Sequence, residues 1–126
     1  MTFAYWCVLA AALLPYITIA FAKYDRGYNN RSPREWEAGL EGRARRAVSA
    51  HQNHFEAFAP FAAAVIIAQL ARVQQMPIDV LAGAFILARI AYTWAYLADR
   101  HALRSLLWMA GLACVIGLFA ASAAAR

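Results

Sequence analysis

The chain has 126 residues, of which 63% are hydrophobic and only 15% are charged. Soluble globular domains contain about 45–50% apolar and about 25% charged residues, so this composition excludes an ordinary soluble domain and is typical of an integral membrane protein. The formal net charge of +5 is not accompanied by a nucleic-acid-binding motif, and we expect no nucleic-acid partner.

Four apolar stretches are long enough to cross a bilayer as helices, because about 20 apolar residues span its hydrocarbon core. They cover roughly residues 2–22, 47–71, 78–98 and 105–125. The connections after the second and third stretches are short, so consecutive helices must be antiparallel. The sequence therefore predicts an all-α membrane protein in which residues 1–126 form one domain, an up-down bundle of four transmembrane helices.

The first connection, residues 23–46, is the only extended polar segment. Its seven cationic side chains are Lys23, Arg26, Arg31, Arg34, Arg43, Arg45 and Arg46. The third connection adds two more arginines, whereas the opposite side has only Arg72 and Arg126. The positive-inside rule places the first and third connections in the cytoplasm and both termini on the other side. Such an excess of cations also favours contact with anionic lipids. Within this segment we expect a short helix from Pro33, with Ser32 as its N-cap.

Polar side chains form a stripe on the second span and another on the third. At about 100° per residue, Asn53 lies about 20° and Glu56 about 80° from Arg46 on one helix face. The matching stripe of the third span consists of Arg89, Tyr92, Tyr96 and Asp99. The stripes share one leaflet, because Glu56 lies about 15 Å beyond Arg46 and Tyr92 about 18 Å before Arg104. Charged side chains inside a membrane usually mark a site, so we expect the two faces to converge on one.

Other interpretations of these residues remain open. Arg89 pairing with Glu56 would brace the bundle as a plain salt bridge, with Asn53 bridging backbone groups. His51 and His54 have the i, i+3 spacing of a metal site, but no cysteine or second carboxylate is suitably spaced. We expect no metal and interpret both histidines as membrane-interface residues. A transporter or channel is disfavoured, since the stripes occupy one leaflet only.

Small residues recur at every fourth position of the last span. They are Ala113, Gly117, Ala121 and Ala125. Such a stripe lets helices approach closely, within a subunit or between subunits.

Two runs of residues carry a resemblance to a known family. The run RAVSAHQNHFEAFAPF resembles the second-helix signature of the MAPEG family, the membrane-associated proteins of eicosanoid and glutathione metabolism. The run ARIAYTWAYLADRHALR resembles the family's second signature, an arginine followed by two tyrosines four residues apart. The segment from Asn30 to Pro33 resembles the bacterial branch. The resemblance covers essentially the whole chain.

This resemblance implies a homotrimer of four-helix subunits in the bacterial inner membrane, and the charge distribution then makes both termini periplasmic. It also implies glutathione as co-substrate, bound between neighbouring subunits and reached from the cytoplasmic side. Carried over one by one, the glutathione-binding positions are Arg26, Arg31, Arg46, Asn53, Glu56, Arg89, Tyr92 and Tyr96. Arg104 takes the catalytic position that faces the thiol, and Arg100 competes with it for that role.

The implied activity is that of a microsomal-type glutathione transferase or peroxidase. The glutathione thiolate would attack a lipophilic electrophile or hydroperoxide that arrives from the membrane lipids. Arginines suit the two carboxylates of glutathione, and Glu56 suits its ammonium group. The chain departs from the family at Ser49, where an arginine is frequent. Because some members bind lipid without catalysis, the alternative is a non-catalytic lipid-binding or scaffold protein of the same fold.

Overall fold

The computed structural model describes residues 1–125, and helices account for nearly all of them. In chain order they are α1 (Phe3–Arg26), α2 (Pro33–Ala38), α3 (Gly42–Leu70), α4 (Gln75–Leu97) and α5 (His101–Ala124). Arg126, which the charge count assigned to the less basic side, lies outside the described residues. Because residues 1–125 contain no strand, the predicted all-α class is confirmed.

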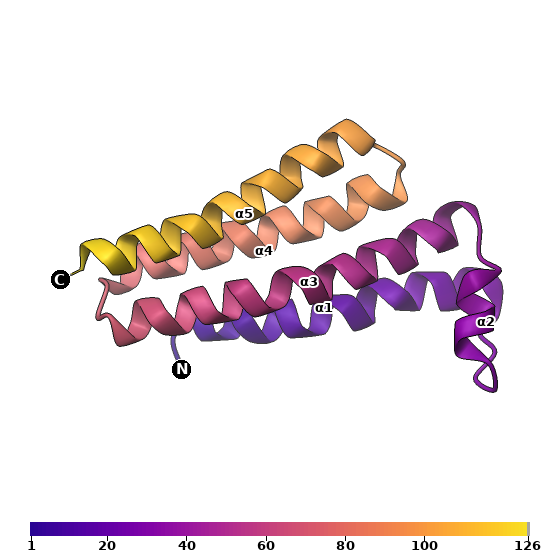
Figure 1. Cartoon of the computed structure of the whole chain (residues 1–126), viewed down its shortest axis with the longest axis horizontal. Helices are drawn as coiled ribbons and strands as arrows, with labels where there is room; N and C mark the ends of the chain where they lie inside the picture. The colour runs from indigo at the N-terminus through magenta and orange to yellow at the C-terminus, as the bar shows by residue number, and fades with distance from the viewer. Residues whose placement is uncertain (126) are drawn as a thin grey trace.

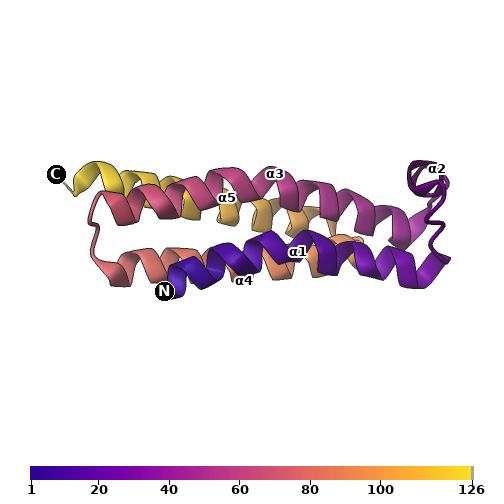
Figure 2. The same ribbon diagram turned by 90° about the horizontal axis from the view of Figure 1, so that it is seen from below.

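The four long helices lie side by side and alternate in direction (Figure 1). Helix α1 packs mainly along α3, and α4 packs mainly along α5. The view from below places α1 and α4 in one layer and α3 and α5 in the other (Figure 2). Short α2 lies at the end where α1 leads into α3, and the α4–α5 turn lies at this same end (Figure 1). Both chain termini and the α3–α4 turn lie at the opposite end.

Among the described residues, α1, α4 and α5 are long and apolar enough to cross a membrane. Helix α3 is the longest, at 29 residues, but the first half of it carries charged and polar side chains. Large apolar side chains are exposed on the outer faces, among them Leu13, Ile17, Ile90 and Leu106. Lipid rather than water suits such a surface. The protein is therefore a multi-pass membrane protein, and a fourth crossing by α3 stays a prediction.

The helices extend beyond the predicted spans on the basic side. Helix α3 begins at Gly42 rather than residue 47, and α5 begins at His101 rather than residue 105, because a helix does not end where the hydrocarbon does. The short helix expected from Pro33 is present, although the Ser32 side chain makes no capping hydrogen bond. Helix α1 ends at Arg26, and the φ of 59° at the following residue, Gly27, suits a residue without a Cβ.

Two apolar clusters form the core, one toward each end of the bundle. Near the termini, Phe61 of α3 and Phe85 of α4 stack with ring centroids 3.9 Å apart. Near α2, the second cluster contains Ile19, Leu40 and Val48, packed among alanines. Small residues let the helices approach, and Gly117 lies against Leu81 of the same subunit. The stretches of α3 and α4 between the two clusters carry buried polar side chains.

Candidate functional site

Arg89 is the centre of this polar layer and is only 2% exposed. Its guanidinium donates hydrogen bonds to Oδ1 of Asn53, at 2.9 Å, and to Nδ1 of His54, at 3.3 Å from Nε and 3.0 Å from Nη2. The guanidinium carbon also lies 4.2 Å from the ring centroid of Tyr92. A buried charge is tolerated where its hydrogen-bonding capacity is satisfied, and here α3 supplies those acceptors. The two predicted stripes therefore do converge at Arg89 and Asn53.

His54, 3% exposed, belongs to this cluster, so its interpretation as a membrane-interface residue was wrong. Arginine can only donate, so Nδ1 of His54 must accept, which leaves the proton on Nε2. That Nε2–H donates to Oγ1 of Thr93 over 2.7 Å. The Thr93 hydroxyl in turn donates to the carbonyl of Arg89 over 3.1 Å. The three residues thus form a closed ring, completed by the backbone carbonyl of Arg89, that holds one tautomer of His54 and one orientation of Arg89.

Glu56 reaches this cluster through Asn53. The Asn53 amide donates from Nδ2 to Oε2 of Glu56 over 3.0 Å, while its Oδ1 accepts from Arg89. The alternative of a direct Arg89–Glu56 salt bridge is therefore wrong, as is the role of Asn53 as a bridge between backbone groups. Within residues 1–125 the one ion pair joins Arg43 to Asp25. Glu56 is exposed, so its carboxylate can still accept a hydrogen bond from a ligand.

Two small cavities lie beside the cluster, and Trp108 lines both of them. One, of about 200 Å³, lies between α3, α4 and α5 and is lined by Asn53, Glu56 and Arg89. The other, of about 220 Å³, is lined by Tyr92, Tyr96 and Arg104 together with Ser105 and Trp108. The first has mostly apolar walls with a few polar and charged groups, whereas the second is lined mainly by hydroxyl groups, a guanidinium and aromatic rings.

The tyrosines and Arg104 contact one another in the second cavity. The rings of Tyr92 and Tyr96 meet edge to face, with centroids 5.6 Å apart, and the Arg104 guanidinium carbon lies 4.5 Å from the Tyr96 centroid. Arg100, the competing candidate, is the exposed N-cap residue of α5, and its side chain makes no hydrogen bond or ion pair with residues 1–125.

Asp99 does not lie on the predicted polar stripe of α4. Helix α4 ends at Leu97, and Asp99 adopts φ 57° in the following turn.

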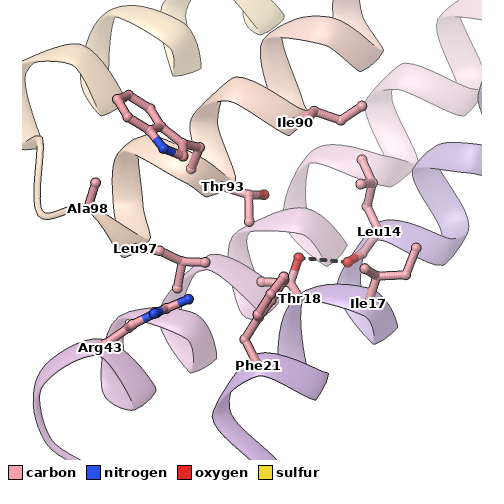
Figure 3. Close-up of a pocket in the computed structure, with 10 residues that line it drawn as sticks. Leu14, Ile17, Thr18, Phe21, Arg43, Ile90, Thr93, Leu97 and Ala98 are labelled. Carbon is pink, nitrogen blue, oxygen red and sulfur yellow. Dashed lines mark hydrogen bonds between the residues drawn. The ribbon is translucent and has the colours of Figure 1, made fainter. Parts of the chain in front are cut away.

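A larger hollow, a groove of about 650 Å³, lies between α1 and α4 (Figure 3). Its walls are mostly apolar, with Ile17 and Phe21 on α1 and Ile90 and Trp94 on α4. Arg43 lies at its end (Figure 3). No residue of the Arg89 cluster other than Thr93 lines it, so the groove is separate from the two small cavities.

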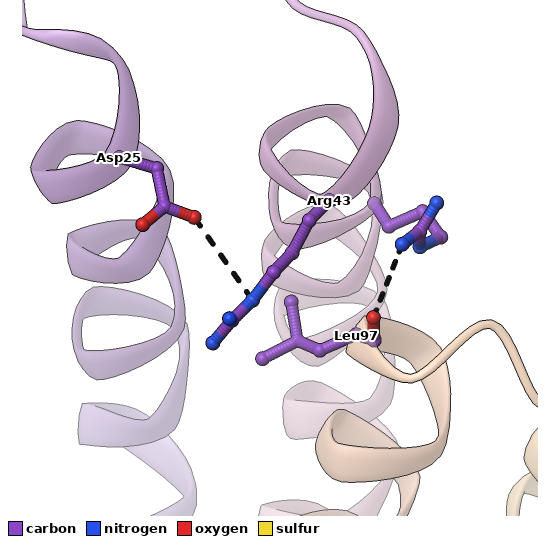
Figure 4. A network of polar contacts seen from close by, with 4 residues as sticks. Asp25, Arg43 and Leu97 are labelled. Atoms are coloured by element: carbon purple, nitrogen blue, oxygen red, sulfur yellow. Dashed lines mark hydrogen bonds and ion pairs between the residues drawn. The ribbon is translucent and has the colours of Figure 1, made fainter.

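Arg46 lies apart from the cluster despite its place on the α3 stripe. It is about 10 Å from Asn53 along the helix. Its Nη2 donates to the carbonyl of Leu97 over 3.2 Å, at the C-terminal end of α4, near the Arg43–Asp25 pair (Figure 4). A cation is favourable there because α4 ends with unpaired carbonyl groups. The buried Nε of Arg46 has no hydrogen-bond partner within the described part of the chain.

The remaining predicted residues lie outside the cluster in a single subunit. Arg26 is exposed in the last turn of α1, and Arg31 is exposed in the loop before α2. Ser49 donates to the carbonyl of Arg45 on its own helix, at 3.2 Å. His51 donates from Nδ1 to the carbonyl of Pro15 on α1 over 2.7 Å, whereas His54 contacts α4. The two histidines thus reach toward different helices.

Comparison with known proteins identifies one family. A model of the MAPEG family matches residues 3–124, which contain the whole cluster and both cavities. Neither a curated protein nor a solved structure matches the chain.

Proposed function

The chain belongs to the MAPEG family, and we propose that it is an integral membrane glutathione transferase or peroxidase. One observation carries the proposal. The Arg89–Asn53–Glu56 chain of hydrogen bonds lines one cavity, and Trp108 also lines a second cavity that contains Tyr92, Tyr96 and Arg104. Cations, hydroxyl donors and one carboxylate are thereby gathered beside an apolar bundle, which suits a ligand that is charged at its ends.

Glutathione matches this set of groups. It carries two carboxylates, one ammonium group and one thiol. Arg89 is held in place and adds positive potential, although its own donors are largely used by Asn53 and His54. The exposed carboxylate of Glu56 is the acceptor for the ligand ammonium.

Arg104 is the group we assign to the thiol. A cation near sulfur lowers the thiol pKa and raises the thiolate fraction at neutral pH. The thiolate sulfur then forms a bond to the electrophilic carbon, and the leaving group departs with its electron pair. With a hydroperoxide, two glutathione molecules are oxidised to the disulfide while the hydroperoxide is reduced to an alcohol and water. Neither reaction needs a covalent bond to the enzyme. Arg100 would take this role if Arg104 does not.

We further propose that the site is completed by a neighbouring subunit of a homotrimer. Arg26 and Arg31 are exposed and do not contact the Arg89 cluster of their own chain. In the trimer that the resemblance implies, these two arginines would cover the cavity of the next subunit. The bound glutathione would lie between subunits, and the lipophilic substrate would reach it from the bilayer.

The proposed location is a bacterial inner membrane, crossed by α1, α3, α4 and α5. Helix α3 lies alongside the three apolar helices in the bundle, which supports a fourth crossing (Figure 1). The basic α1–α3 segment and the α4–α5 turn would face the cytoplasm, and both termini the periplasm. A reporter that is active only in the cytoplasm should be silent when fused to the C-terminus; activity there would reverse this orientation.

A non-catalytic binding or scaffold protein is the second candidate. The observation that favours it is Ser49, which bonds to its own helix where relatives frequently have an arginine. A subunit that lacks this cation has one group fewer for a glutathione carboxylate, and weaker binding would follow.

The experiment is a calorimetric titration of the purified protein with glutathione, followed by ultraviolet measurement of thiolate absorbance and a turnover assay with a generic aryl halide. Binding, thiolate formation at neutral pH and turnover are expected together. Binding without thiolate or turnover would favour the non-catalytic candidate, and no binding at all would reject glutathione as the ligand.

A further inference from the structure

The groove between α1 and α4 is larger than either of the two small cavities, and the proposed glutathione site does not use it. On α1 its lining runs from Leu14 to Phe21, and on α4 from Ile90 to Ala98, so it extends about 10–12 Å along the helices. It opens on the outside of the bundle, where Ile17, Ile90 and Trp94 are exposed. In a bilayer this surface faces acyl chains.

The walls offer almost no hydrogen-bonding capacity to an occupant. Two hydroxyls line the groove, and both are engaged by the protein itself. Thr18 donates to the carbonyl of Leu14 at 2.7 Å, and this hydrogen bond is visible in Figure 3. Thr93 accepts from His54 and donates to the carbonyl of Arg89. A polar occupant would therefore lose its hydrogen bonds to water along the walls, whereas a hydrocarbon chain would not.

Arg43 is the single charged side chain in the lining, and it lies at the end nearest α2. Its partner Asp25 is 3.9 Å from its Nε, and the Arg43 side chain is 55% exposed. A long, exposed ion pair of this kind contributes little to stability, so the guanidinium can turn to another anion at small cost. A guanidinium also binds phosphate oxygens with two parallel hydrogen bonds.

The charge around this end matches an anion. Residues 23–46 contain seven cationic and four acidic side chains. Basic segments at a membrane surface attract anionic lipids by about 1 kcal/mol for each cation near the surface. We propose that the α1–α4 groove is a binding site for an anionic phospholipid, with one acyl chain between Ile17 and Ile90 and the headgroup phosphate on Arg43. The site does not depend on whether the protein turns over glutathione.

The test measures lipid binding by native mass spectrometry of the full chain in detergent. The probes are phosphatidylglycerol and phosphatidylcholine with identical acyl chains, and oleic acid as a single-chain anion. Arg43→Gln removes the cation at an exposed position. Arg34→Gln is the matched control, because it lowers the net charge equally in exposed α2, outside the groove. Ile90→Trp fills the groove, and Ile17→Trp does so from the other wall.

Wild type should prefer phosphatidylglycerol over phosphatidylcholine. Arg43→Gln should weaken phosphatidylglycerol binding by about tenfold, because a charge-assisted hydrogen bond is lost, and should not affect phosphatidylcholine. Arg34→Gln should leave the affinities for both phospholipids within about twofold of wild type. Ile90→Trp and Ile17→Trp should each abolish the preference for phosphatidylglycerol. If Arg43→Gln and Arg34→Gln weaken phosphatidylglycerol binding equally, the preference comes from the general surface charge, and the proposed site is wrong. Preferential binding of oleic acid, or dissociation of an oligomer by the tryptophan variants, would assign the groove to a different occupant.

Discussion

Arg89 of α4 and Asn53 of α3 are joined by a hydrogen bond of 2.9 Å that links the two helices in the polar layer of the bundle. Asn53 faces in two directions at once, since its oxygen accepts from Arg89 and its nitrogen donates to Glu56. An amide is the side chain that can do both, which explains why Asn rather than Asp occupies the position between a cation and a carboxylate.

Replacing Asn53 with leucine should therefore destabilise the bundle. The variant leaves one Arg89 donor without its acceptor and removes the donor from Glu56, which should cost about 1–3 kcal/mol. Gln52→Leu is the control, because Gln52 is the exposed neighbour on the same helix. Thermal melting in detergent without ligand measures both variants. Equal melting temperatures for Asn53→Leu and Gln52→Leu would mean that the hydrogen bond contributes nothing to stability.

Glu56→Gln should weaken glutathione binding and leave the fold intact. The glutamine oxygen still accepts from Asn53, and Arg89 keeps both of its acceptors, so little stability is lost. The charge that faces the ligand ammonium is gone, and the dissociation constant should rise by about tenfold or more. Glu35→Gln in exposed α2 is the control. A glutathione analogue without its amino group distinguishes loss of the ammonium contact from an indirect change in the site. This analogue should bind wild type and Glu56→Gln equally weakly. An analogue that still distinguishes the two proteins would remove Glu56 from the ammonium site.

Thr93→Val should leave the Nε2–H of His54 without its acceptor and so destabilise the fold. The substitution keeps the shape of the side chain but removes the oxygen that accepts from His54 Nε2–H, and it should cost about 1–3 kcal/mol. Thr18→Val is the control, because Thr18 also lines the α1–α4 groove but donates only to a carbonyl of its own helix. Nitrogen chemical shifts of labelled histidine report the tautomer directly. Wild type should carry the proton on Nε2, and a proton on Nδ1 would contradict the ring of hydrogen bonds.

Much of this arrangement could be predicted from the sequence, because it follows from helical geometry. The composition predicted the all-α membrane class, and the short connections predicted antiparallel neighbours. The depths of Glu56 and Tyr92 within their helices placed the two polar stripes in one leaflet. These inferences needed only the rise and rotation per residue, which vary little between helices.

What could not be predicted depended on how the helices are rotated against each other. His54 lies about 100° from Asn53 on α3, outside the stripe, yet Arg89 contacts both. The sequence feature that points to His54 is Thr93, which follows Arg89 by one helical turn and supplies a hydroxyl group at the same depth. Arg46 was assigned to the site, but the end of α4 offers it a carbonyl nearer than the cluster. Asp99 left its stripe because α4 stops two residues before it.

The assignment of Arg104 to the thiol can be tested against Arg100. Arg104 lies over Tyr96 in the second cavity, whereas Arg100 is exposed at the start of α5. Arg104→Ala should raise the pKa of bound glutathione and lower turnover at neutral pH more than it weakens binding. Arg100→Ala should change neither. The thiolate absorbance of bound glutathione across pH measures the shift. If only Arg100→Ala raises the thiol pKa and lowers turnover, Arg100 rather than Arg104 faces the thiol.

The proposal that a neighbouring subunit completes the site predicts complementation between two defective chains. Arg31→Ala and Glu56→Ala should each bind glutathione poorly as pure proteins, because every site then lacks one group. If Arg31 acts on the neighbour's cavity, a mixed trimer contains sites where an intact Arg31 from one chain meets an intact Glu56 from the next.

For equal amounts of the two chains, about one quarter of the sites should then be intact, since each contributing position is correct half of the time. Co-expression with two different affinity tags yields the mixed assemblies, and native mass spectrometry identifies the trimers among them. Calorimetry should detect a fraction of high-affinity sites near that value in the mixture and none in either pure variant. A mixture without high-affinity sites would mean that Arg31 and Glu56 act within one chain. Undiminished binding by pure Arg31→Ala would remove this arginine from the site, and a dominant monomer would reject the shared site altogether.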